Sequence, residues 1–193
     1  MSLPHLIYLH GFLSSPFSQK AQDTAVWMAE QQLADYLHCP QLPMEPLACG
    51  ELIRHEVEKL RGEKLCFIGS SLGGYFATWA VEEFGGKAVL INPAVRPYEE
   101  LANHIGPQRN YQTGELYQID LSFADTLRLY ERVPTDLSRY WLLTQTGDEV
   151  LDYRHAVAKF AGSRQDVEEG GDHGFQNFAR WLPAIWAFAQ DQP

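Results

Sequence analysis

Apolar residues alternate along the chain between short continuous runs and longer stretches with helical spacing. A short continuous run predicts a strand buried on both faces, because such a strand has no polar side. We predict strands over residues 5–9, 64–69, 87–91, 139–145 and roughly 164–168. We predict helices near residues 18–37, 50–62, 72–84, 152–161 and 175–190. This alternation is typical of an α/β fold with a mostly parallel sheet of five to six strands and helices on both faces.

Two of these helices carry apolar residues that we expect to face the core. Near residues 18–37 the apolar positions with helical spacing are Ala21, Ala25, Met28, Ala29 and Leu33. The Pro-rich stretch 40–46 then breaks the pattern. In the charged helix near 50–62, the core-facing candidates are Leu52, Val57 and Leu60.

Residues 96–137 differ from the rest of the chain. They combine three prolines and several polar loops with a short helical pattern near 122–131. We predict that residues 98–137 form a lid, because such an insertion lies above the carboxyl ends of the strands, where open α/β sheets bind ligands. The mixture of apolar positions and breaks favours a flap packed loosely over a pocket. The alternative is a segment that covers one sheet face and does not move.

Composition supports one α/β domain over residues 1–193. The 193 residues are 45% hydrophobic, which is enough for one sizeable core. The formal net charge of −10 and the scattered basic residues argue against nucleic acid or an anionic membrane surface as partner. Cys39, Cys49 and Cys66 share no CxxC spacing, so neither a disulfide framework nor a zinc site is indicated. With no signal-peptide pattern and no run long enough to span a membrane, we expect a cytoplasmic protein.

The sequence Gly69-Ser70-Ser71-Leu72-Gly73 carries the clearest chemical signal. It is a G-x-S-x-G motif between a predicted strand and a predicted helix, where a tight turn exposes a serine as nucleophile. The register selects Ser71, because choosing Ser70 would put Ile68 and Leu72 at the glycine positions. The alternative interpretation is a glycine-rich turn with an incidental serine.

A serine nucleophile in such a fold requires an acid and then a histidine further along the chain. Of the three histidines after Ser71, His104 lies in the predicted lid and His155 lies in a helix with charged neighbours. His173 lies in a glycine-rich loop between the last predicted strand and the last helix. We therefore predict His173 as the general base.

Asp148 is the predicted acid. It is the first carboxylate after the strand at 139–145, and its role would be to accept the second ring N–H of His173. Asp152 is the alternative, although it resembles the N-cap of the helix near 152–161. We expect Glu149 to point away if Asp148 points inward.

The oxyanion formed during attack requires two backbone N–H donors. We predict that of Leu72, at the positive end of its helix, and that of Phe12, in the loop after the first strand. Gly11 lets this loop pass close to the substrate. We expect His10 to shape the loop through hydrogen bonds and to have no catalytic role.

Several stretches of the chain together resemble the YqiA-like bacterial esterases, a family of small α/β-hydrolases. The stretches are Ile7–Ser15, Ile68–Thr78, Val89–Pro97, Gln145–Arg154 and Glu169–Phe175. The resemblance implies an esterase that acts on acyl esters or thioesters, and Ser71, Asp148 and His173 fall at the positions of the family's triad. It also implies a minimal α/β-hydrolase fold that lacks early edge strands.

Together these observations predict a serine hydrolase that cleaves carboxylic esters of small molecules through an acyl-enzyme on Ser71. No metal and no organic cofactor is implied by this chemistry. An acyl thioesterase would use the same three residues, and a catalytically inactive hydrolase fold that serves as a binding module is a third hypothesis. The acyl length, the leaving group and the oligomeric state are left open.

Overall fold

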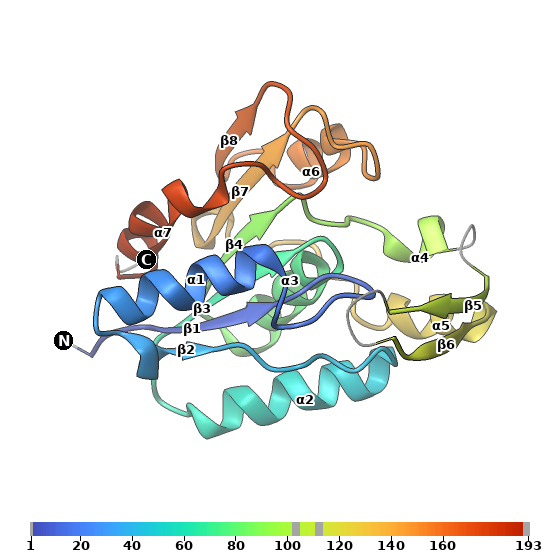
Figure 1. The fold of residues 1–193 in the computed structure, drawn as a ribbon, viewed down its shortest axis with the longest axis horizontal. Coiled ribbons are helices and arrows are strands. Elements are labelled where there is room, and N and C mark those ends of the chain that lie inside the picture. The colour runs from blue at the N-terminus through green and yellow to red at the C-terminus, as the bar shows by residue number, and fades with distance from the viewer. Residues whose placement is uncertain (1, 102–104, 111–113, 191–193) are drawn as a thin grey trace.

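The computed structural model describes residues 2–101, 105–110 and 114–190. Its elements alternate between strands and helices from one end to the other (Figure 1). In chain order they are β1 (His5–Leu9), α1 (Gln19–Glu30), the 3-10 helix η1 (Ala34–Tyr36), β2 (Leu37–His38), α2 (Pro46–Lys59), β3 (Leu65–Ser70), α3 (Leu72–Phe84), β4 (Lys87–Ile91), α4 (Pro97–Glu100), β5 (Gly106–Arg109), β6 (Leu116–Ile119), α5 (Leu121–Arg128), the 3-10 helix η3 (Leu137–Arg139), β7 (Tyr140–Gln145), α6 (Tyr153–Lys159), β8 (Arg164–Glu168), the 3-10 helix η4 (Phe178–Trp181) and α7 (Leu182–Gln190).

Six strands form one sheet in the order β2-β1-β3-β4-β7-β8, and every neighbouring pair is parallel (Figure 1). The four strands predicted from apolar runs are confirmed as β1, β3, β4 and β7, and the strand predicted near 164–168 is confirmed as β8, which is partly exposed. The order changes direction at β1 and β3, since β2 lies on one side of this pair and β4 on the other. An open parallel sheet binds ligands at the carboxyl ends of its strands near such a switch point.

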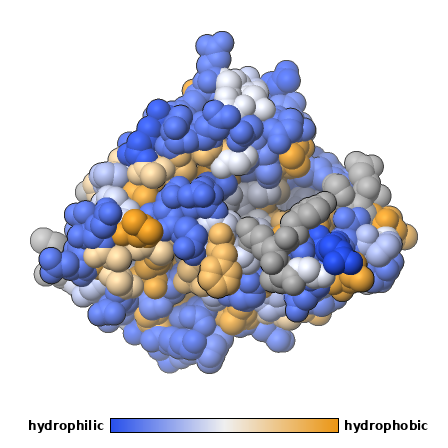
Figure 2. Space-filling view, viewed as in Figure 1, coloured by the Kyte–Doolittle hydropathy of each residue, from blue (hydrophilic) through white to orange (hydrophobic). Residues whose placement is uncertain are grey.

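Both faces of the sheet are covered, because successive residues of a strand point to opposite sides. Ile7 and Phe67 are fully buried on the face that α2, α3, α5 and α6 cover. Their neighbours Tyr8 and Ile68 are buried on the opposite face, under α1, η4 and α7. Outside these layers the surface in view is mostly hydrophilic, with apolar residues in scattered small groups (Figure 2).

The helix predicted near residues 18–37 is too long. α1 ends at Glu30, Gln32 has a positive φ of 61°, and the chain continues into the short strand β2. There Leu37 pairs with Leu6 of β1, which adds the sixth strand to the sheet. The apolar pattern ran past the end of the helix because Leu33 packs on the same core as the helix although it lies outside it.

The helix predicted near 50–62 begins earlier than expected. α2 starts at Pro46, whose lack of an N–H costs nothing in the first turn. Its buried face is formed by Cys49, Gly50 and Ile53, whereas the expected core residues Leu52, Val57 and Leu60 are only partly buried.

The helix predicted near 175–190 starts later than expected, because α7 begins at Leu182. Phe175 and Asn177 both have a positive φ of 58°, which turns the chain before η4. Both phenylalanines of this turn and of η4, Phe175 and Phe178, are buried under the sheet. The turn therefore anchors the loop that precedes it.

The segment at 98–137 consists of α4, the antiparallel hairpin β5–β6 and α5. Phe123 and Leu127 of α5 are buried in the main core, so loose packing was the wrong expectation for this helix. Leu116 and Leu121, by contrast, are 66% and 68% exposed. The predicted-lid residues His104 and Tyr111 lie outside the described residues. Opening of the segment as a lid stays a prediction.

The packing of α5 can be tested with two leucines of the same segment. Leu127→Ala should lower the free energy of unfolding by about 2–5 kcal/mol, because Leu127 is fully buried and its truncation leaves a cavity. Leu129→Ala is the control, since Leu129 is 62% exposed and its change should stay within about 0.5 kcal/mol. Equilibrium unfolding in urea measures both. Equal small effects would mean that α5 does not belong to the core.

Candidate active site

The turn between β3 and α3 carries Ser71 in a conformation that few side chains adopt. Its φ is 53° and its ψ is −121°, outside the common regions for an L-residue. The turn is possible because a β-carbon at Gly69 would lie 2.4 Å from the Gly73 carbonyl oxygen, and one at Gly73 only 1.9 Å from that of Leu9. Two glycines therefore let α3 start directly against β1 and β3.

Hydrogen bonds hold this turn between two neighbouring strands. The Ser71 N–H donates to the Ile91 carbonyl at 3.1 Å, and the Ser71 carbonyl accepts from the N–H groups of Gly74 and Ala94 at 2.9 and 3.0 Å. The strained residue is thus fixed through its backbone, and its side chain remains available at the carboxyl edge of the sheet.

Of the three residues predicted as a triad, Ser71 and Asp148 each lie within hydrogen-bond distance of His173. The Ser71 Oγ is 3.1 Å from the His173 Nε2, and the His173 Nδ1 is 2.9 Å from both carboxylate oxygens of Asp148. Because an ionised carboxylate only accepts, the imidazole proton belongs on Nδ1. The Nε2 can then accept the hydroxyl proton of Ser71.

Asp148 is held as an ionised acceptor. Its side chain is 1% exposed, and burial alone would raise its pKa. The hydrogen bond from His173 and those from the N–H groups of Leu151 and Val150, each at 2.9 Å, outweigh this effect and lower the pKa. A carboxylate with these partners stays charged and fixed in direction.

Asn92 links the loop of His173 to the sheet, a role that sequence analysis missed. It follows β4, is 2% exposed and has a positive φ of 40°. Its amide nitrogen donates to the carbonyls of Asp172 and His173 at 3.0 and 3.2 Å. Its amide oxygen accepts from the Gln145 N–H at 3.0 Å. A buried polar residue directly after an apolar strand was the available signal.

Two charged residues also hold the histidine loop. The Glu149 carboxylate accepts from the His173 N–H at 3.0 Å, so it turns toward the loop and does not point away as we expected. Asp148 and Glu149 can both face the loop because one bonds the ring and the other the backbone. On the other side, the Lys20 ammonium of α1 donates to the Gly174 carbonyl at 2.7 Å. Both contacts join segments far apart in the sequence.

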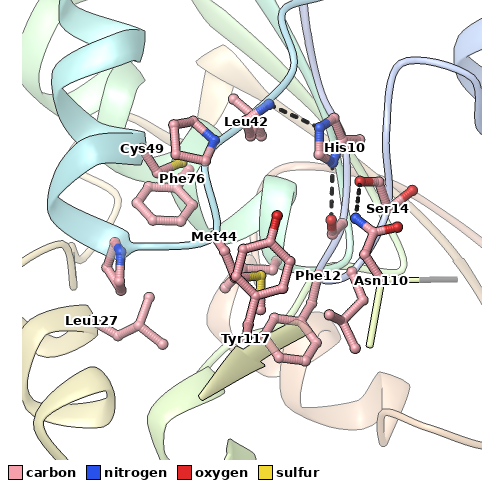
Figure 3. A pocket seen from close by; sticks show the side chains of 15 residues that line it. His10, Phe12, Ser14, Leu42, Met44, Cys49, Phe76, Asn110, Tyr117 and Leu127 are labelled. Carbon is pink, nitrogen blue, oxygen red and sulfur yellow. Dashed lines mark hydrogen bonds between the residues drawn. The ribbon is translucent and has the colours of Figure 1, made fainter. Parts of the chain in front are cut away.

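The loop after β1 passes beside the serine. A β-carbon on Gly11 would lie 3.2 Å from the Ser71 Cβ, closer than ordinary van der Waals contact, so a side chain there would crowd the serine. His10 is buried and shapes this loop, as expected: its Nδ1 bonds the Gly11 carbonyl at 3.0 Å and its Nε2 accepts from the Leu42 N–H at 3.0 Å (Figure 3). The insertion contributes as well, since the Asn110 amide donates to the Ser14 carbonyl at 3.2 Å.

Several pockets lie near the site, and the one in Figure 3 is lined in part by Phe12 and Leu72. The pocket that contains Ser71, which we call the reaction pocket, has a volume of about 80 Å³ and is lined by Phe12, Ser71, Leu72, Ala94, Pro97, Glu100, Leu101, Val150 and Leu151. Both predicted oxyanion donors, Phe12 and Leu72, therefore border the space in front of Ser71. The use of their N–H groups in catalysis stays a prediction. The wide pocket, of about 670 Å³, lies between α4, the chain after α5 and α6.

The alternative candidates lie elsewhere. Asp152 caps α6, with its carboxylate accepting from the Arg154 N–H at 3.0 Å. His155 is exposed on α6, and His104 lies outside the described residues. Within the described parts of the chain, no three His, Cys, Asp or Glu side chains gather as metal ligands would. Among the same residues, no helix has the length and apolar character needed to cross a membrane.

Comparison with known proteins gives the same fold. The model of a family described as "Uncharacterised protein family (UPF0227)" matches residues 5–190. Est1E from Butyrivibrio proteoclasticus is similar in structure, with a TM-score of 0.69 at 13% identity over 97% of this chain and 87% of that one. The Paleococcus ferrophilus monoacylglycerol lipase has a TM-score of 0.64 at 12% identity over 97% of each chain. The esterase domain of a Rhodothermus marinus protein has a TM-score of 0.64 at 17% identity over 98% and 88%. The predicted α/β-hydrolase fold is thereby confirmed.

The charge of Asp148 should make its contribution to stability depend on pH. Its pKa in the folded protein is lowered, so the ionised form stabilises the fold above the unfolded pKa of about 3.9, and this stabilisation is lost as the pH falls through the folded value. Asp148→Asn should therefore lower the free energy of unfolding at pH 7, and the difference from the wild type should shrink toward pH 3. Urea unfolding across this range measures it. A difference that is constant with pH contradicts the assignment.

Proposed function

The chain belongs to the UPF0227 family, and from this premise we propose that it is a serine hydrolase that cleaves carboxylic esters through an acyl-enzyme on Ser71. One observation carries the proposal: the unbroken contacts from the Ser71 Oγ through the His173 ring to the Asp148 carboxylate. The names of similar structures, which include esterases and a lipase, support the same chemistry.

The proposed reaction begins at Ser71. The His173 Nε2 takes the hydroxyl proton as the Ser71 Oγ attacks the ester carbonyl, and the Asp148 carboxylate stabilises the imidazolium. The N–H groups of Phe12 and Leu72 would hold the oxyanion, with Leu72 at the positive end of α3. The alcohol leaves with the proton from His173. Water then attacks the acyl-enzyme with the same base, which returns the acid and free Ser71.

The reaction pocket supports a substrate with an apolar acyl group. Seven of its nine lining residues are apolar, and such pockets bind the hydrocarbon part of a ligand while a few polar groups orient it. A thioester carbonyl would meet the same nucleophile and the same base, so a substrate panel must include both ester types. A binding module without catalysis would have no use for the contacts that orient His173 on both of its ring nitrogens.

Covalent labelling tests the nucleophile. Ser71→Ala should abolish ester hydrolysis and labelling by a fluorophosphonate probe, because the attacking oxygen is gone. The matched control is Ser70→Ala. Ser70 is the preceding residue, the last of β3, and it is 7% exposed. This variant should keep its labelling. Near-ultraviolet circular dichroism checks that both variants are folded. Labelling that survives in Ser71→Ala would reject the proposal.

The role of the acid is tested separately. Asp148→Asn should lower kcat by a factor on the order of 10⁴, because the amide no longer fixes the histidine tautomer or stabilises its positive charge. Asp152→Asn serves as comparison: the asparagine can still cap α6, and kcat should stay close to that of the wild type. Steady-state kinetics on one ester decides between them. The reverse order of the two effects would make Asp152 the acid.

A further inference from the structure

Glu100 is the only charged residue that lines the reaction pocket within the described part of the chain. It is the last residue of α4 and is partly buried. Its carboxylate makes no hydrogen bond and no ion pair with any described residue. Burial raises its pKa, while His155 and His173 act in the opposite direction. A carboxylate that loses water without gaining a partner costs free energy, and such groups concentrate at functional sites.

Glu100 also lines the wide pocket, so it stands where the two pockets meet. A substrate whose carbonyl lies at Ser71 and whose acyl group fills the apolar reaction pocket must extend its alcohol part away from that pocket. The wide pocket has the volume to receive it, and Glu100 lines both pockets. The negative charge of Glu100 therefore acts on the alcohol part of the substrate.

Most basic groups of the wide pocket are already matched by other carboxylates. Arg96 pairs with Glu99 at 3.6 Å, and Arg132 pairs with Glu83 at 3.3 Å. Burial lowers the pKa of Lys159 on α6, and the nearby Glu131 carboxylate acts in the opposite direction. His155 is the basic group whose charge acts most on Glu100.

On the reaction side, His173 lowers the pKa of Glu100 and Asp148 raises it. The Asp148 carboxylate is therefore close enough to act on Glu100. The chain as a whole carries a formal net charge of −10, which attracts cations and repels anions over longer distances. The Glu100 carboxylate and the overall charge of the chain therefore both favour a cationic ligand.

We propose that Glu100 determines specificity by selecting esters whose alcohol part carries a protonated amine or a quaternary ammonium group. The cation supplies the partner that Glu100 lacks, and an anionic alcohol part is repelled. This inference rests on the proposed hydrolase function. It concerns the choice of substrate and leaves the roles of Ser71, Asp148 and His173 unchanged.

Three esters with the same short acyl group test the selection. Their alcohols are choline, its neutral isostere 3,3-dimethylbutanol, and the anionic 3-hydroxypropionate. In the wild type, kcat/KM for the choline ester should exceed that for the neutral ester by about tenfold, the scale of one partly screened charge pair. Glu100→Gln should bring this ratio to about one, because the amide has the same shape without the charge. Glu100→Lys should reverse the order and favour the anionic ester.

Glu63→Gln is the control, since Glu63 is an exposed carboxylate that lines neither the reaction pocket nor the wide pocket. It should keep the wild-type ratio. A wild-type ratio that persists in Glu100→Gln, or equal rates for all three esters in the wild type, overturns the specificity assignment while hydrolysis itself stands. If the wild type neither cleaves any of the esters nor reacts with a fluorophosphonate, the proposed function fails and this inference fails with it.

Discussion

The close contact of α3 with the strands beneath it is the constraint on which the site depends. Gly73 lies so near the Leu9 carbonyl that any side chain would collide with β1, and a side chain at Gly69 would collide with the first turn of the helix. Because the chain turns from β3 into α3 at a single residue, the backbone of Ser71 is strained and has a positive φ. A relaxed, wider turn would withdraw its hydroxyl from His173 and its backbone from Ile91. The position of the nucleophile therefore follows from packing between helix and sheet.

The parallel arrangement of the sheet brings the other groups to the same place. Asn92 follows β4, Asp148 follows β7 and His173 follows β8, and the carboxyl ends of these strands share one edge. Asn92 connects these ends, since its buried amide bonds both β7 and the histidine loop. Each group is thus oriented by a neighbour that follows a different strand. A small movement of one loop would therefore change the hydrogen bonds of the others.

The insertion between β4 and β7 has two parts with different roles. α5 belongs to the main core through Phe123 and Leu127, and the Phe123 ring meets that of Phe12 edge-on. α4 instead carries Glu100 to the boundary between the two pockets. The same segment thus contributes a rigid support and the only partnerless carboxylate at the pocket that faces Ser71 within the described residues. Substrate choice in this chain is therefore expected to depend on the insertion more than on the strands.

The sequence alone determined the parallel sheet, the turn at Ser71 and the candidates Asp148 and His173, because apolar runs and local motifs report short-range constraints. It misjudged the end of α1 and the start of α2, since Leu33 and Cys49 face the core irrespective of where a helix begins. Only the tertiary structure decided the roles of Asn92, Glu149 and Lys20. Each of them bonds the histidine loop from 24 or more positions away in the chain, and no local pattern records such a contact.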